Sequence, residues 1–489
     1  MITYGPPLWQ HQRDALRAIH SHRGTLLWVP MGGGKSRVIV DYIQTMAPLK
    51  PSPHPPGDPY RVLLICPNKA VINVWPTELL KWSHPDFHYL LLPLAEIPIP
   101  YRAAHITRML ADTQPTTAQI VILNYEAAPR TPLSSLLLKT PWDLIIMDEC
   151  HRIKAPGGQQ SRYMQRLCAK APKVVGLSGT PMPQGPIDIY AQARAIAPTI
   201  WGTSLQRFRD AYCIMGPSGT NKATGKPYPA FLAHTIQGYR NMDDFHAKLA
   251  SWVFHVEPAV VEAGLPDYTD VTRHTPLPHA AQSAYDELER EMCAELDDKF
   301  VTVDNALTKQ LRLAQLTAGH WLDPDTGKTN QVHTAKLDAA MEIIEDAAPT
   351  ERLVIFARFR PELADYRDAI LRTTNRKPCM LMGGTDELPL WKQTPGGILI
   401  VQIAAGAEAV SFVEARYQIY STVTWSYSQY EQSRRRIRRH GQTRPVTYYH
   451  LIAPGTVDED AHSALASKGN VIEEVRRGIR QRQGRTHPA

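Results

Sequence analysis

The chain has 489 residues, which is more than one hydrophobic core usually holds, so we expect two or three domains. Hydrophobic residues make up 43% of the sequence and charged residues 21%, a balance that excludes an intrinsically disordered chain. The net charge of +7 comes from 54 lysines and arginines against 47 acidic residues. This mild excess permits a polyanionic partner but does not require one.

The six cysteines are widely spaced and include no CxxC pair, which excludes a disulfide framework or a zinc module and predicts reduced thiols. The first residues lack the charged and apolar segments of a secretory signal. The apolar run at 89–94 is too short to cross a bilayer. We therefore expect a cytoplasmic protein with no membrane partner.

Within the first 200 residues, apolar runs typical of buried strands alternate with segments of helical spacing. Helices are expected at 8–21, after residue 36, and within 68–82, where Pro76 suits the first turn of a helix that runs through Trp82. Five runs predict strands, at 24–30, 61–67, 119–126, 143–149 and 173–181. The alternation predicts an α/β fold with a doubly wound parallel sheet, and the polar motifs follow the strands at their carboxyl ends.

A glycine-rich loop, Met31-Gly32-Gly33-Gly34-Lys35-Ser36, lies between the first strand and a helix. In a phosphate-binding loop, glycines let backbone N–H groups surround an anion, the lysine reaches the β- and γ-phosphates, and the hydroxyl binds Mg²⁺. The general pattern asks for a further glycine where this chain has Val29. A flexible glycine turn before a helix is the alternative, and the flanking strand and helix favour the phosphate loop.

Two acids end the fourth strand run, Asp148 and Glu149, and His151 follows. Carboxylates at this edge of a sheet can divide the work of phosphate cleavage, one holding Mg²⁺ and the other polarising a water. The alternative is a solvated strand end whose carboxylates begin a turn or cap a helix. Taken alone, this stretch favours that alternative, because short motifs often occur by chance.

The remaining chain divides into a helical insertion or linker at 201–330, a second α/β lobe at 331–465 and a basic tail at 466–489. The insertion includes a Gly/Pro/Lys loop at 216–230. Strands in the second lobe are predicted at 352–358, 378–382, 396–402, 417–422 and 446–452. The tail reads as a terminal helix with a charged face, which could brace the fold or contact nucleic acid.

Five arginines fall within the six residues 434–439, and none of these residues is acidic. One interpretation is a nucleic-acid or targeting patch. The other is a set of arginine fingers that reach the phosphates held by Lys35 and raise hydrolysis when the lobes close. The residues alone leave both interpretations open.

Six sequence blocks follow one another along the chain: MGGGKS, ICPNKAVINVWPTELLKW, DECHRIK, LSGTP, IFARFR and QSRRRIRRHGQ. Together they resemble superfamily-two helicase motors, most closely the Swi/Snf branch of double-stranded DNA translocases. The resemblance covers residues 8–460. It implies two tandem RecA-like lobes with ATP and Mg²⁺ bound between them, and a compact protein of the bacterial or phage type.

The resemblance also implies a role for each matched residue. For the nucleotide, Gln12 would read adenine, the loop Gly32, Gly33, Gly34, Lys35 and Ser36 would hold phosphates and Mg²⁺, Asp148 would ligate Mg²⁺, Glu149 would activate water, and Arg436 and Arg439 would complete the site. His151, Ser178, Gly179, Thr180 and Gln432 would couple that site to DNA, and Asn68, Lys69, Asn124 and Tyr125 would follow a phosphate backbone.

Three positions depart from the family pattern. Cys150 replaces an alanine, while Ala407 and Ala409 stand where the second lobe has glycines, which alanine replaces poorly at positive φ. We expect an ATP-dependent DNA motor on duplex DNA. The alternatives are a helicase that separates strands of single-stranded DNA or RNA, and a non-catalytic nucleic-acid clamp.

Overall fold

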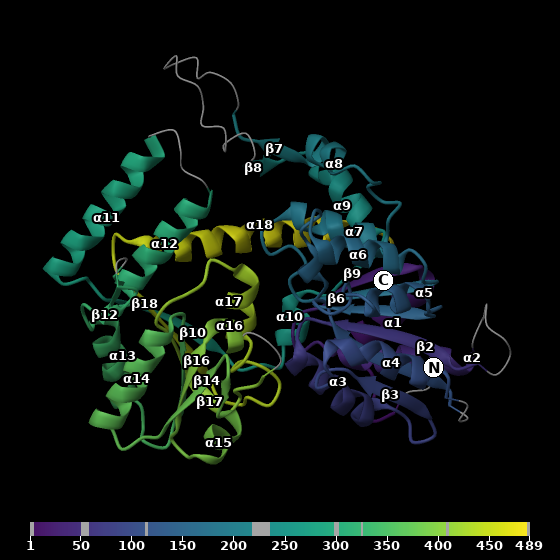
Figure 1. Ribbon diagram of the computed structural model, residues 1–489, viewed down its shortest axis with the longest axis horizontal. Helices are drawn as coiled ribbons and strands as arrows, with labels where there is room; N and C mark the ends of the chain where they lie inside the picture. Colours follow the sequence, from purple (N-terminus) through teal and green to yellow (C-terminus); the bar gives the residue numbers. More distant parts are fainter. Residues whose placement is uncertain are drawn as a thin grey trace. The chain divides into compact units, whose positions relative to one another are not determined.

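A computed structural model describes residues 4–49, 58–112, 116–217, 235–297, 303–323, 326–406 and 410–486 (Figure 1). The chain divides into two compact units, the first comprising Met1–Val261 with Asn470–Ala489 and the second Glu262–Gly469. Each unit is built on its own seven-stranded sheet. In the described residues, no helix combines the length and the hydropathy needed to cross a membrane.

The sheet of the first unit is parallel throughout. Its order is β3 (Tyr89–Pro93), β4 (Ala118–Asn124), β2 (Tyr60–Cys66), β5 (Leu144–Asp148), β6 (Lys173–Ser178), β1 (Gly24–Trp28) and β9 (Val253–His255). The register pairs Trp28 with Ser178 and Cys66 with Asn124, so the carboxyl ends of these strands meet along one edge. The predicted doubly wound sheet is confirmed, and the apolar run at 89–94 is an edge strand.

The helices of the first unit connect these strands. They are α1 (Gln10–Ser21), α2 (Lys35–Leu49), α3 (Lys69–Trp82), α4 (Ile99–Leu110), α5 (Leu133–Lys139), α6 (Gln159–Cys168), α7 (Ile189–Ile196), α8 (Leu205–Tyr212) and α9 (Met242–Ala250), with α10 (Pro258–Glu262) at the division between the units. Short 3₁₀ turns lie at Cys150–Ile153 and Pro186–Asp188, and β7 (Cys213–Met215) pairs antiparallel with β8 (Ile236–Tyr239).

One predicted detail of α3 is wrong. Pro76 was expected in the first turn, but the helix begins at Lys69, because the Asn68 side chain caps it by accepting a hydrogen bond from Val71 N at 3.0 Å. Pro76 therefore lies in the middle of the helix. The cap and the apolar spacing outweigh the preference of proline for a first turn.

The sheet of the second unit has the order β10 (Tyr268–His274), β18 (Val446–Ile452), β17 (Ala415–Tyr420), β13 (Arg352–Ala357), β16 (Ile398–Gln402), β14 (Pro378–Met382) and β15 (Thr385–Asp386). Only β15 runs antiparallel to its neighbour. The helices are α11 (His279–Asp297), α12 (Val303–Thr317), α13 (Ala335–Asp346), α14 (Arg360–Thr373), α15 (Leu388–Gln393), α16 (Ile403–Gly406) and α17 (Tyr427–Arg434). A hairpin pairs β11 (His320–Leu322) with β12 (Thr329–Gln331).

Both faces of this second sheet are buried. Alternate residues of β13 belong to different clusters: Leu353 and Ile355 pack with α13 and α14, whereas Val354 and Phe356 pack against α15 and the segment after α17. Figure 1 shows α13 and α14 side by side on one face. Strands buried on both sides read as continuous apolar runs, which is why the sequence predicted them.

The predicted domain boundaries differ from the observed division. Residues 201–330, interpreted as one helical insertion, are split at 261/262, and each part adds a strand to a sheet: β9 pairs with β1, and β10 pairs with β18. β9 has only three residues, and β10 is an edge strand whose residues are mostly exposed. Neither carries the apolar run that reveals a buried strand.

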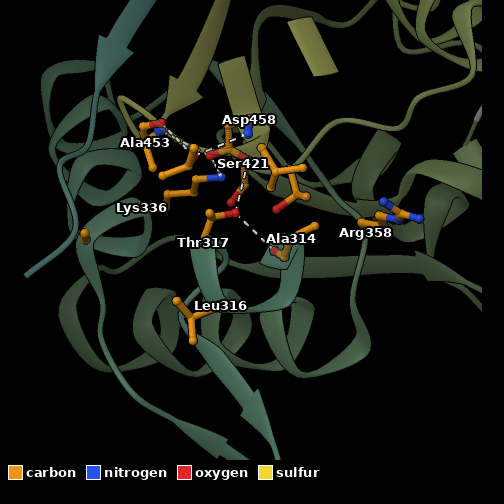
Figure 2. Close-up of polar contacts among 12 residues, drawn as sticks. Ala314, Leu316, Thr317, Lys336, Arg358, Ser421, Ala453 and Asp458 are labelled. Carbon is orange, nitrogen blue, oxygen red and sulfur yellow. Dashed lines mark hydrogen bonds and ion pairs between the residues drawn. The ribbon is translucent and has the colours of Figure 1, made fainter. Parts of the chain in front are cut away.

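A buried polar cluster ties three helices of the second unit together (Figure 2). Lys336 Nζ of α13 lies 2.6 Å from Asp458 Oδ2 at the start of α18 (Val457–Thr486), and the two side chains are 2% and 6% exposed. Asp458 also accepts hydrogen bonds from Thr317 Oγ1 of α12 and from Ala453 N. Additional hydrogen bonds of this kind are what make a buried ion pair tolerable.

Helix α18 includes most of the predicted basic tail. Its residues from Asn470 onward belong to the first unit, where Ile472, Val475 and Ile479 are buried. The Arg476 guanidinium lies 5.3 Å from the Trp28 ring centroid. Residues 470–479 therefore pack within the first unit, and a role of the tail as a brace or a nucleic-acid contact stays a prediction. The predictions for Arg480, Arg482 and Arg485, for Ala407 and Ala409, and for most of the loop 216–230 lie outside the described residues or side chains.

Candidate active site

The glycines of the loop between β1 and α2 are required by its shape. Gly32 and Gly34 have positive φ values of 82° and 77°. A Cβ at Gly33 would lie 2.5 Å from Val29 Cγ1, and one at Gly34 would lie 2.1 Å from Gln12 Nε2. Val29, which stands where the general pattern has glycine, thus packs against the loop. Side chains at these positions would force the loop open.

Two side chains, Lys35 and His11, hold this loop in place, and a third, Gln12, packs beside Gly34. Lys35 Nζ donates a hydrogen bond of 2.9 Å to the Val29 carbonyl, and His11 Nε2 lies 2.9 Å from the Gly33 carbonyl oxygen. Gln12 is 4% exposed, and its Oε1 accepts a hydrogen bond from Trp9 N at the start of α1. The proposed contact of Gln12 with adenine stays a prediction. His11 was not singled out by sequence analysis, since a histidine on a helix is a common surface residue.

Asp148, the last residue of β5, contacts a tryptophan. Its Oδ2 accepts a hydrogen bond of 2.9 Å from Trp75 Nε1 of α3, and its backbone carbonyl accepts one of 3.0 Å from the Tyr125 hydroxyl. Burial and the nearby Glu149 carboxylate raise the pKa of Asp148 to about 6, although Trp75 and the Lys35 charge oppose the rise. A cation bound beside Asp148 would relieve this repulsion.

Glu149 has a left-handed backbone, with φ 47° and ψ 53°, which a non-glycine residue seldom adopts. Its side chain makes no hydrogen bond that caps the following 3₁₀ turn, so the simple capping alternative is not what this structure shows. Unusual backbone conformations cluster at functional sites, where the surrounding structure holds them.

A short polar relay connects Glu149 to the end of β6. His151 Nδ1 lies 3.3 Å from Glu149 Oε2 and 3.0 Å from Ser178 Oγ. The Ser178 hydroxyl lies 3.5 Å from Glu149 Oε2 and accepts a hydrogen bond of 3.1 Å from Thr180 N. The Gly179 carbonyl accepts one from Trp28 Nε1 of β1. The structure thus gathers the residues that the sequence predicted as catalytic and coupling residues of this unit.

Cys150 sits between these residues as a buried spacer. Its Sγ donates a hydrogen bond of 3.2 Å to Gln192 Oε1. Burial raises the pKa of its thiol well above the ordinary value, and the charges of Glu149 and Asp148 add to the rise. A thiol that stays protonated is a poor nucleophile, which agrees with the interpretation of Cys150 as a small substitute for alanine.

Of the four residues expected to follow a phosphate backbone, one is misassigned. Tyr125 is 1% exposed and its hydroxyl is bonded to Asp148, so the expectation that its side chain contacts DNA is wrong. Asn124 is held on both sides, by Arg102 and by Glu126. Asn68 caps α3, and the side chain of Lys69 lies outside those described. The roles of Asn68, Lys69 and Asn124 stay predictions.

The arginines of residues 434–439 are mostly bound within the second unit. Arg434 makes two hydrogen bonds to Asp270, and Arg435 and Arg438 both pair with Glu262. The interpretation of the whole segment as an open nucleic-acid patch is therefore wrong for these three residues. The sequence could not reveal these ion pairs, because the acidic partners lie about 170 residues away in the chain.

No contact in the structure tests the roles predicted for Arg436, Arg439 and Gln432, so these roles stay predictions. Arg436 is 3% exposed and donates a hydrogen bond of 3.0 Å to the Val410 carbonyl, while Gln432 is 6% exposed on α17. Gln442, which ends the same sequence block, donates to the Val413 and Ala415 carbonyls and so holds the block against β17.

Comparison with known proteins identifies the family. The SNF2-related domain matches residues 9–320, well over half of the chain. Protein p41 of Acyrthosiphon pisum secondary endosymbiont phage 1 is 23% identical over 94% of this chain and 95% of its own length. The human DNA annealing helicase and endonuclease ZRANB3 is 22% identical over 86% of this chain, which corresponds to only 37% of ZRANB3.

A solved structure titled Sulfolobus solfataricus SWI2/SNF2 ATPase core in complex with dsDNA aligns with 96% of this chain and 93% of its own, at 18% identity and a TM-score of 0.41. A score this low adds nothing to the assignment, which rests on the domain match. The predicted resemblance to the Swi/Snf branch is confirmed. The chain belongs to the SNF2-related family of helicase-like ATP hydrolases.

Proposed function

We propose that this ATP hydrolase is a motor that moves along duplex DNA. The observation that carries the proposal is the relay from Glu149 through His151 and Ser178 to Thr180, with steps of 3.0–3.5 Å. A residue that activates water does not need such a connection for hydrolysis alone. A link from that residue to the end of the next strand supports a coupling of hydrolysis to movement.

The residues present fit a nucleotide-bound Mg²⁺ ion. Ser36 and Asp148 would hold it. Burial and the neighbouring Glu149 carboxylate raise the pKa of Asp148 although the Lys35 charge opposes the rise, so a bound cation would stabilise the ionised carboxylate. In the part of the chain that the structure describes, no group of three or more His, Cys, Asp or Glu side chains is placed to hold a metal ion by itself. This suits Mg²⁺, which is typically held by one or two carboxylates together with substrate phosphates. The ion would neutralise charge on the phosphates.

The protein's own groups would then do the following. The loop glycines present N–H groups to the phosphates, and Lys35 supplies the charge that orients them. Glu149 accepts a proton from the attacking water, and His151 and Ser178 hold the Glu149 carboxylate in place. Trp75 fixes Asp148 by donating a hydrogen bond to its Oδ2, and Asp148 would hold the ion through its carboxylate.

The DNA partner is supported by the relatives. Human ZRANB3 is named a DNA annealing helicase, although this chain spans little more than a third of it. We propose duplex DNA rather than a single strand because the resemblance is to the branch of double-stranded DNA translocases. Since the phage protein p41 matches along nearly its whole length, we also propose that the chain acts in the cytoplasm of a bacterium or of a phage-infected cell.

The test is a panel of ATPase rates with duplex DNA, single-stranded DNA and RNA of equal phosphate concentration. We expect the largest stimulation with duplex DNA, and Glu149→Gln serves as the inactive control. A maximum with single-stranded DNA or RNA would instead support a helicase that separates strands. Binding of DNA without any stimulation would reject the motor.

A further inference from the structure

A basic groove lies on the first unit between α6 and α7. It has a volume of about 670 Å³ and is lined by Gln159, Arg162, Gln165, Arg166, Ala169, Arg194 and Pro198. The lining includes three arginines and two glutamines but no carboxylate. We propose that this groove binds the phosphodiester backbone of a DNA duplex, as a site separate from the carboxyl edge of the sheet; this rests on the proposed function.

The first support is the spacing of the lining residues on α6. Residues 159, 162 and 166 are three or four apart and residue 165 adjoins 166, so these four share one face of the helix, while Met164, Leu167 and Cys168 on the other face are buried. Arg162 and Arg166 are both exposed and stand four residues apart. Like charges in that position repel and weaken a helix, so stability does not explain them.

The second support is the lack of charge compensation. Residues 150–209 include nine lysines and arginines but one acid, an excess larger than the net charge of +7 of the whole chain. That acid, Asp188, is 4% exposed and accepts a hydrogen bond from Gln184 N. Among the described residues, the guanidinium groups of Arg162, Arg166 and Arg194 have no ion pair. Arginines without counter-charges concentrate an attractive field for a polyanion.

The third support is Arg194, on the α7 side of the groove. Its Nη1 donates a hydrogen bond of 3.0 Å to the Thr203 carbonyl, which fixes the side chain, yet its Nε is buried without an acceptor. A buried donor that lacks an acceptor is unfavourable. Because this Nε is closed to solvent, a phosphate in the groove would meet other atoms of Arg194, which lines it.

The lining also favours duplex DNA over other polyanions. It includes no aromatic side chain, so bases could not stack there as single strands require. Its only apolar residues are Ala169 and Pro198, which offer no pocket for the anchoring side chain of an acidic peptide. Arginine and amide donors without apolar anchors suit a phosphate backbone that is read without regard to sequence.

The end of the groove at Ala169 lies away from the ATP site, whereas Gln159, at its other end, begins α6 close to the turn that follows Glu149. Arg23, which immediately precedes β1, donates hydrogen bonds to the carbonyls of Cys168 and Ala171 at the end of α6. The end of α6 is therefore near the amino ends of the strands, whereas the catalytic residues are at their carboxyl ends. DNA held here would contact a second region of the first unit.

The test compares Arg162→Gln/Arg166→Gln with Arg108→Gln/Lys139→Gln, which removes two exposed charges of the same sign from α4 and α5. We expect the groove variant, at about 0.1 M salt, to bind duplex DNA about ten- to a hundredfold more weakly than the control, and the slope of log affinity against log salt to fall by about 2. ATPase activity without DNA should stay unchanged in both variants.

Equal duplex affinity and slope in the two variants would overturn the inference, as would a groove variant that loses binding only to polyglutamate. Charge reversal, Arg162→Glu/Arg166→Glu, should weaken duplex binding further, and a variant that binds like the control would reject the groove. Failure of the motor function would appear elsewhere, as wild-type ATPase that duplex DNA does not stimulate, whereas the groove is judged by affinity alone.

Discussion

The pKa values of two carboxylates, Asp148 in the first unit and Asp270 in the second, are shifted in opposite directions. In the first unit, burial and the Glu149 charge raise the pKa of Asp148 to about 6. In the second, burial alone would raise the pKa of Asp270, but hydrogen bonds from His450 and Arg434 hold it well below its ordinary value. Both units have the same α/β architecture. The difference shows where the chain keeps like charges together and where it neutralises them.

Charged side chains without an opposite charge nearby are typical of a site that binds a charged ligand. Charged side chains that pair with an opposite charge are typical of residues that stabilise the fold. On this criterion the segment 434–439 divides. Arg434, Arg435 and Arg438 stabilise the second unit through Asp270 and Glu262. Arg436 and Arg439 have partners as well, so their contact with the phosphates stays a prediction from the family resemblance, and variants can test it.

The largest effect is expected from Arg439→Ala. If Arg439 acts as an arginine finger, the rate of ATP hydrolysis should fall about 10³–10⁵-fold, while ATP affinity stays within several-fold. Steady-state ATPase and nucleotide-binding assays measure the two quantities. Arg438→Gln is the matched control, since its loss should lower stability and leave hydrolysis by the folded protein intact. If Arg439→Ala instead hydrolyses ATP normally and loses only DNA affinity, Arg439 is a DNA contact.

Glu149→Gln should have the next largest effect. The amide cannot accept the proton of the attacking water, so hydrolysis should fall about 10²–10⁴-fold, whereas ATP binding persists. Glu96→Gln, at an exposed position of the same unit, should leave both unchanged. Turnover at the wild-type rate in Glu149→Gln would show that Glu149 is not the general base.

Lys336→Met tests how much the buried ion pair between Lys336 and Asp458 stabilises the second unit. Its loss leaves Asp458 charged and buried (Figure 2), which should lower the free energy of unfolding by about 3–5 kcal/mol in urea titrations. Lys392→Met breaks a more exposed pair with Glu414 and should change it by less than about 1 kcal/mol. Equal, small changes would mean that the cluster of Figure 2 does little for stability.

The smallest effect concerns pH and Asp270. Because the folded pKa of Asp270 lies below the unfolded value of about 4, its stabilising contribution is present above pH 4 and is lost as the pH falls below that value. The stability difference between wild type and Asp270→Asn should therefore shrink by about 1 kcal/mol from pH 6 to pH 3, a modest figure because the carboxylate is 43% exposed. Urea titrations at both pH values measure it. Glu345→Gln, at an exposed position of α13, is the control variant.

Much of the fold could be predicted because it depends on local sequence patterns. The buried runs of β1, β2, β4, β5 and β6 are continuous and apolar, and the glycine loop and Asp148 directly follow such runs. Parallel strands bring their carboxyl ends to one edge, so the approximate meeting of Lys35, Asp148, Glu149 and Ser178 followed from topology. Short or exposed strands such as β9 and β10 have no such signal.

By itself, the sequence determined the two α/β lobes, the loop at 31–36, and the chemistry of the residues at 148–151, because each depends on neighbours in the chain. Only the tertiary structure decided which charges are compensated. Tyr125 turned inward to Asp148, Trp75 reached the same carboxylate from α3, and Glu262 and Asp270 met arginines from the far end of the second unit. Pairing of this kind depends on distances in space between residues far apart in the chain, which no local pattern encodes.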